Sequence, residues 1–133
     1  MKRRLGVLLL TAASATSLAH HATALFDLDR TVIVDGVVRS FEWTNPHAWI
    51  WIESTTPAGT TTRLGFECGA LGILRRQGWT RGEFVPGDHV KVSFHPFKDG
   101  TPGGGFVSAT FADGHVLGSR DPGKGGAPPA IAN

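Results

Sequence analysis

The segment Ala70–Gly78, which reads ALGILRRQG, interrupts a series of strand-like segments. Leu71 and Leu74 recur at a helical spacing, whereas the residues before and after the segment alternate between apolar and polar types. Gly78 follows a basic last turn and is a typical helix C-cap. We therefore predict one short helix over residues 70–77, with Leu71 and Leu74 buried, between a third and a fourth strand.

Five strands are predicted around this helix from their period-two alternation. The first is long and is interrupted by Asp35-Gly36, which we interpret as a bulge or a sharp bend. In the fourth, Val90, Val92 and Phe94 alternate with polar residues, so we expect these three side chains to be buried and His89 and Lys91 to be exposed. The predicted strands cover residues 31–43, 47–53, 60–68, 89–95 and 106–112, with a short continuation over 115–117.

The order of these elements predicts an all-β fold with one short helix. A long, bent first strand and a helix between the third and fourth strands are typical of an OB-fold, so we expect a small OB-fold-like five-stranded barrel. SH3-like barrels lack that helix, and a sandwich would need about seven strands. Cys68 is the only cysteine, so no internal disulfide can form. It is in phase with Leu64 and Phe66 and is expected to be a buried, inert thiol.

The first 19 residues have the features of a signal peptide. Lys2-Arg3-Arg4 precedes an apolar run that is too short to span a membrane, and Ser17-Leu18-Ala19 places small residues where a signal peptidase reads. A second cleavage point follows Ala24, but cleavage after Ala19 is closer to the apolar run and is preferred. We expect a periplasmic or secreted protein without a transmembrane segment after cleavage, organised as a signal peptide (1–19), a single domain (20–117) and a disordered Gly/Pro-rich tail (118–133).

The excess of basic over acidic residues in the full chain comes from the predicted signal peptide. The full chain has 13 Lys and Arg against 11 Asp and Glu, a formal net charge of +2. Cleavage after Ala19 removes three basic residues and no acidic one, which leaves a net charge of about −1. Binding of nucleic acid through its phosphates needs a concentrated basic face, and the only adjacent basic pair left is Arg75-Arg76. Nucleic acid is therefore not expected as a partner.

The segment with the highest density of candidate functional side chains is Phe41–Trp51, which reads FEWTNPHAWIW. It spans the loop between the first and second strands, which borders the ligand face of OB-folds. If Trp49 and Trp51 face outward, they form a stacking platform for sugar rings, flat ligands or a partner protein. If they face inward, they fill the core. The predicted ligand-binding residues are Trp43, Asn45, His47, Trp49 and Trp51.

Cleavage after Ala19 would create a mature N-terminus at His20-His21. A free α-amine and the imidazole of the same N-terminal histidine form a chelate that suits Cu(II), and His47 is the first choice for a further nitrogen. In this copper-binding alternative the metal ligands are His20, His21 and His47. In the other interpretation, the two N-terminal histidines belong to a solvated leader.

The sequence contains no complete catalytic signature. Glycines 103–105 are followed by neither Lys-Ser/Thr nor a helix, so they do not form a phosphate loop. Glu42, Glu53 and Glu67 are candidates for the acid/base pair of a small hydrolase, but ordinary solvated strand positions account for them better. We therefore expect a non-enzymatic binding or accessory module for an unknown small ligand or a periplasmic protein partner. A copper-binding protein and a small hydrolase are the alternatives.

Several short motifs are spread along the predicted domain. They are His20-His21, Phe41–Trp49 (FEWTNPHAW), Arg75–Thr80 (RRQGWT), Pro86-Gly87-Asp88 and His95-Pro96. Together they resemble a family of exported bacterial proteins, of proteobacterial type, whose function is unknown. The resemblance covers nearly the whole domain and implies an exported Gram-negative protein. It implies no activity, because it brings no established catalytic or binding residues with it.

Overall fold

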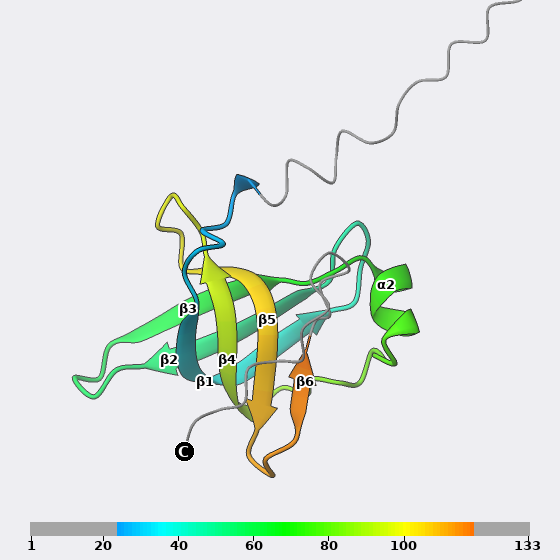
Figure 1. Ribbon diagram of the computed structural model, residues 1–133. Helices are drawn as coiled ribbons and strands as arrows, with labels where there is room; N and C mark the ends of the chain where they lie inside the picture. Colours follow the sequence, from blue (N-terminus) through cyan, green and yellow to red (C-terminus); the bar gives the residue numbers. More distant parts are fainter. Residues whose placement is uncertain (1–23, 119–133) are drawn as a thin grey trace, which may run out of the picture.

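The computed structural model describes residues 24–118, in which strand β1 (Val32–Glu42) pairs with two different strands. Residues 32–37 pair antiparallel with β4 (His89–Pro96), and residues 37–42 pair antiparallel with β2 (Trp49–Thr55). A strand shared in this way curls the sheet, and Figure 1 shows β4 and β5 running at a steep angle to β2 and β3. The predicted signal peptide and the predicted tail beyond Gly118 lie outside the described residues.

The curvature of β1 depends on two neighbouring positions. Its register with β2 shifts around Arg39, which places a bulge there. At Gly36 the strands come close, because a Cβ at this position would lie 2.7 Å from the backbone oxygen of Glu53. Of the bulge or sharp bend predicted at Asp35-Gly36, the bulge is found at Arg39 instead, and Gly36 permits the close approach of the two strands.

A parallel pairing closes the barrel. β3 (Thr61–Glu67) lies beside β2 and β5 (Gly103–Phe111) lies beside β4, so that the order is β3-β2-β1-β4-β5. β3 and β5 then pair in parallel between Gly65–Glu67 and Gly103–Gly105. The predicted five-stranded barrel is confirmed, and β6 (Val116–Gly118) adds a strand beyond β5.

Glycines 103–105 belong to β5, whereas the fifth strand predicted from the sequence begins only at residue 106. A Cβ at Gly103 would overlap the backbone of Gly65 on β3, and one at Gly104 would overlap the backbone carbonyl of His95 on β4. Gly103 also has a φ of +117°, which glycine adopts readily. The absence of side chains is what allows three backbones to meet where the barrel closes.

The predicted helix is confirmed as α2 (Leu71–Arg76), at one end of the barrel in Figure 1. Leu71 and Leu74 are buried in the core, as the helical spacing predicted. Gly78 has a φ of +89°, and the backbone N–H of Trp79 donates to the Leu74 carbonyl at 3.0 Å, so the chain turns back towards the core. Among the helices of the described residues, none has the length and apolar content for a membrane crossing.

The core combines the inward faces of the strands with a cluster of aromatic rings. Val90, Val92 and Phe94 of β4 are buried and the alternating His89 and Lys91 are exposed, which confirms the predicted face. Tilted and edge-on ring contacts connect Phe41, Trp43, Trp79, Phe84, Phe106 and Phe111. Since the chain has a single cysteine, burial of this apolar surface is the main source of stability.

Candidate functional site

Trp49 and Trp51 lie on the outer surface of β2. Because side chains alternate along a strand, Ile50 and Ile52 point into the barrel and are 0% exposed, while the two tryptophans are half-buried on the opposite face. Their rings are stacked, with centroids 5.7 Å apart and planes inclined by 16°. Of the two arrangements that the sequence left open, the outward one is found. We call the stacked pair Trp49 and Trp51 the tryptophan platform.

Strand β3 supplies the groups beside the platform. Its register pairs Glu67 with Trp49 and Gly65 with Trp51. The Trp51 ring covers Gly65, where a Cβ would come within 2.5 Å of the ring. The Arg63 guanidinium lies over the same ring, 4.9 Å from its centroid, as a cation–π contact. Trp51 is therefore held between its neighbours, and Trp49 forms the end of the row.

His47 and Glu67 form a close pair next to Trp49. His47 Nδ1 is 2.5 Å from Glu67 Oε1, and the Glu67 side chain is 12% exposed against 35% for His47. Burial raises the pKa of Glu67 above its ordinary value, and the charge and hydrogen bond of His47 only partly offset this. The pair places an imidazole and a carboxyl group at the Trp49 end of the platform.

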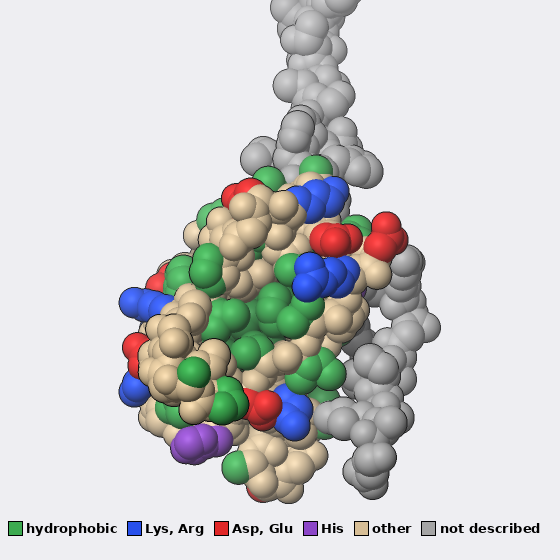
Figure 2. Space-filling model, turned by 90° about the vertical axis from the view of Figure 1, so that its left-hand side faces the viewer, with side chains coloured by type: hydrophobic (Ala, Val, Ile, Leu, Met, Phe, Trp, Pro, Cys, Tyr) green, Lys and Arg blue, Asp and Glu red, His purple; other side chains and the backbone are tan. Residues whose placement is uncertain are grey.

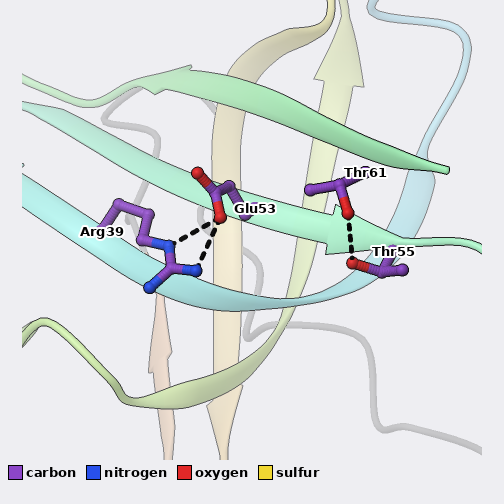
Figure 3. A network of polar contacts seen from close by, with 4 residues as sticks. All are labelled: Arg39, Glu53, Thr55 and Thr61. Atoms are coloured by element: carbon purple, nitrogen blue, oxygen red, sulfur yellow. Dashed lines mark hydrogen bonds and ion pairs between the residues drawn. The ribbon is translucent and has the colours of Figure 1, made fainter. Parts of the chain in front are cut away.

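A second group of polar contacts continues the outer surface beyond Trp51 (Figure 3). Arg39 Nε donates a hydrogen bond to Glu53 Oε2 at 2.8 Å, and Arg39 Nη2 is 2.6 Å from the same oxygen. The hydroxyls of Thr55 and Thr61 are 2.9 Å apart across β2 and β3. The Glu53 carboxylate on this surface thus has a cationic partner, Arg39. The hydroxyls of Thr55 and Thr61 lie at the end of the surface that is farther from Trp49.

The other two predicted binding residues make structural contacts. Trp43 is buried in the core (9% exposed), with its ring edge-on to that of Phe41. Asn45 Oδ1 accepts a hydrogen bond from the backbone N–H of Leu71 at 3.3 Å, which ties the loop between β1 and β2 to the start of α2. The residues that the structure gathers at the platform are His47, Trp49, Trp51, Arg63, Gly65 and Glu67.

Three members of this group, Arg63, Gly65 and Glu67, were not among the ligand-binding residues predicted from the sequence, and Glu67 was considered there only as part of an acid/base pair. Alternation along the third strand predicts which side chains share a face, but it does not say which residue lies opposite which. The hairpin loop between β2 and β3 sets that register, and it places the smallest residue opposite the largest at Gly65 and Trp51. A glycine directly opposite a tryptophan in a β-hairpin is the sequence feature that would have identified the site.

The copper-binding alternative depends on residues outside the described part of the chain. His20 and His21 are not among those residues, so the chelate stays a prediction. In the described part, no three His, Cys, Asp or Glu side chains gather in a way that would hold a metal ion. Cys68 is buried, and burial raises the pKa of its thiol, so the thiol is protonated at neutral pH. This agrees with the expected inert role of Cys68.

Two adjoining hollows lie near the bend of β1, and the larger one reaches the far end of the platform surface, because Glu53 and Thr55 line it. The larger, of about 470 Å³, contains Asp35 and Lys91, and the smaller, of about 330 Å³, contains Asp88 and Asp113. His89 lies at the edge of both. The hollows form only where the curved β1 meets β2, β4 and β5, so no local sequence pattern predicts them.

One face of the molecule, drawn in Figure 2, has apolar side chains gathered in its middle. Acidic and basic side chains are interspersed around them, so this face has no concentrated basic area. Among the described residues, the large apolar side chains that are more than half exposed are Leu25, Leu28, Ile33 and Val85. Single exposed apolar residues of this kind are ordinary features of protein surfaces.

A family model described as "Family of unknown function (DUF6152)" matches residues 8–106. The match covers the chain from before β1 to the start of β5 and so includes the whole platform. It agrees with the resemblance of the motifs to a family of unknown function, and it does not address export or bacterial origin. No curated protein and no solved structure matches the chain at a significant level. Function therefore has to be argued from the geometry of the site.

Proposed function

We propose that this chain, which belongs to DUF6152, a family of unknown function, is a non-enzymatic binding module whose ligand stacks on the tryptophan platform. The observation that carries the proposal is the parallel stack of Trp49 and Trp51 on the outer surface of β2. Aromatic rings left partly exposed as a flat pair suit the binding of other rings. In OB-folds, the outer face of strands 2 and 3 is the usual ligand surface.

The groups around the platform support binding rather than catalysis. Glu53 contacts Arg39 and Glu67 contacts His47, so each of these carboxyl groups is paired with a basic side chain and not with the other carboxyl group. The Cys68 thiol is buried and is not a nucleophile. The signal-peptide features of the first residues support a periplasmic or secreted location for this module.

The proposal is tested with the four tryptophan indole N–H signals of an NMR spectrum of the protein. Cellotetraose, adenosine, indole and a proline-rich peptide are the probes, added one at a time. We expect at least one probe to shift the signals of Trp49 and Trp51. The signals of Trp43 and Trp79, which lie in the core, should stay in place. Trp49→Phe and Trp51→Phe identify the two surface signals.

Ile33→Ala is the matched control, because Ile33 is a 59% exposed apolar side chain on β1, a strand that does not carry the platform. This variant should respond to the probes as the unaltered protein does. The proposal fails if all four signals stay unmoved with every probe, or if only the signals of the buried pair move.

A further inference from the structure

We infer that the ligand of the tryptophan platform is an uncharged oligosaccharide. The inference rests on the proposed function and names the ligand class of the same site. The outer face of strands 2 and 3 takes both oligonucleotides and oligosaccharides in OB-folds. Charge and hydrogen-bonding groups around Trp49 and Trp51 favour the second class.

The basic side chains beside the platform are already engaged. Arg39 is bound to Glu53 through two nitrogens, and the Arg63 guanidinium lies over the Trp51 ring. Single-stranded nucleic acids are held in positively charged grooves that follow their phosphates. Since Arg39 is neutralised by a carboxylate and Arg63 already contacts a ring, this surface does not offer such a groove.

Acidic side chains flank the exposed end of the platform. Trp49 is paired across the sheet with Glu42 on β1 and with Glu67 on β3. Glu42 is exposed, and Glu67 is one partner of the His47 pair. A phosphate or sulfate group stacked near Trp49 would face these carboxyl groups, so a polyanionic ligand is disfavoured at the position where stacking is most accessible.

The polar groups at both ends of the platform suit the hydroxyls of a sugar. A pyranose ring presents C–H groups that stack on an aromatic face and hydroxyls at its rim that donate and accept hydrogen bonds. His47 and Glu67 contact each other through Nδ1 and Oε1, so Nε2 and Oε2 are the atoms that would meet hydroxyls. Thr55 and Thr61 provide two more hydroxyl groups at the other end.

The length of the surface indicates a chain of sugars instead of a single ring. β2 runs from Trp49 to Thr55, seven residues, and its outward side chains alternate along that length. At about 3.3 Å per residue this row is about 20 Å long. A tetrasaccharide can therefore contact the platform and the polar groups at both ends together, whereas a monosaccharide cannot.

The test compares neutral and charged probes on the full protein. The neutral probes are cellotetraose, maltotetraose and tetra-N-acetylchitotetraose with their monosaccharides, and the charged ones are a heparin tetrasaccharide and an oligothymidine. We expect one neutral tetrasaccharide to bind about tenfold more tightly than its monosaccharide and than either charged probe. Raising the salt from about 50 mM to about 200 mM should change its Kd less than about twofold, because no phosphate contacts are made.

Variants connect this binding to the platform. Trp49→Ala should weaken the tetrasaccharide about tenfold or more, since loss of one stacked ring removes a contact of that size. Trp49→Phe should keep part of the affinity, because a ring remains. Ile33→Ala, on β1, should leave the Kd unchanged, and the indole signals report that each variant is folded.

The outcomes separate the inference from the proposed function. If oligothymidine or the heparin fragment binds more tightly and Trp49→Ala abolishes that binding, the ligand class is wrong and the platform still binds. If a tetrasaccharide binds equally well to Trp49→Ala, or if none of the sugars binds, the inference is wrong. If none of the probes moves the signals of Trp49 and Trp51, the inference and the proposed function are both wrong.

Discussion

Trp43 and Trp79 lie in the core of the barrel, whereas Trp49 and Trp51 lie on its outer surface. The buried pair is 9% and 3% exposed, and the surface pair is half-buried. The neighbours differ as well: the Trp79 ring meets the Phe106 ring at 89°, while the Trp49 and Trp51 rings are inclined by only 16°. Edge-on rings interlock in the core, whereas the nearly parallel surface pair stays partly open to solvent.

A tryptophan side chain serves packing or recognition, depending on the environment in which the fold places it. In the core, Trp79 is surrounded by Phe41, Phe84 and Phe106, so its value is the apolar area it buries. On the surface, Trp51 has a guanidinium over its ring and a glycine opposite it on β3, and these neighbours hold the ring in place. Stability should therefore depend on the first pair and binding on the second.

The largest effect on stability is expected at Trp79. Trp79→Ala leaves a cavity among the core aromatics and should lower the free energy of unfolding by about 3–5 kcal/mol. Urea denaturation followed by far-UV circular dichroism measures this loss. A loss below about 1 kcal/mol would mean that Trp79 contributes no more to the free energy of unfolding than a surface side chain does. The contrast between the two tryptophan pairs would then disappear.

An intermediate effect is expected at Gly65. Gly65→Ala places a methyl group 2.5 Å from the Trp51 ring, so the ring has to move, which should lower the free energy of unfolding by about 1–3 kcal/mol. In a Trp51→Ala background the clash is absent, so Gly65→Ala should lower the free energy of unfolding by clearly less. Urea denaturation of the four proteins of this cycle measures the coupling. Equal costs in both backgrounds would contradict the placement of the ring over Gly65.

A smaller effect on stability is expected at Trp49. Trp49→Ala removes a half-buried ring and its stack on Trp51, which should lower the free energy of unfolding by about 1 kcal/mol. The same measurement as for Trp79→Ala gives the value. A loss as large as that of Trp79→Ala would show that the platform is part of the packing core and would weaken the case for a binding role.

The smallest effect concerns pH and Glu67. Because burial raises its folded-state pKa above 4.5, the protonated form is favoured by folding, and this contribution to stability is lost as the pH rises through the folded-state pKa. Glu67→Gln cannot titrate. As the pH rises from about 4 to about 7, the unaltered protein should lose this contribution to its free energy of unfolding and the variant should not. The difference in free energy of unfolding between the two proteins should therefore shift in favour of the variant. Urea denaturation at both pH values tests this, and a constant difference between the two proteins would contradict it.

Much of the fold was predictable because its signals are local. The helical spacing of Leu71 and Leu74 between alternating segments predicts the element order, and that order predicts the barrel. The burial of Val90, Val92 and Phe94 on β4 follows from alternation, whereas the burial of Ser93 between them does not. The strand character of glycines 103–105 was not predictable, because these residues have no side chains to alternate and pair with β3 through contacts distant in the sequence.

The site was predictable only in part, for the same reason. The sequence by itself determined that Trp49 and Trp51 share one face of a strand and that Ile50 and Ile52 share the other, since side chains alternate along any strand. Only the tertiary structure decided which face is turned outward, because closure of the barrel buries one face of every strand at once. It also brought the Arg63 side chain over Trp51 and placed Glu67 against His47. Those contacts depend on the register between strands, which no single segment of the sequence contains.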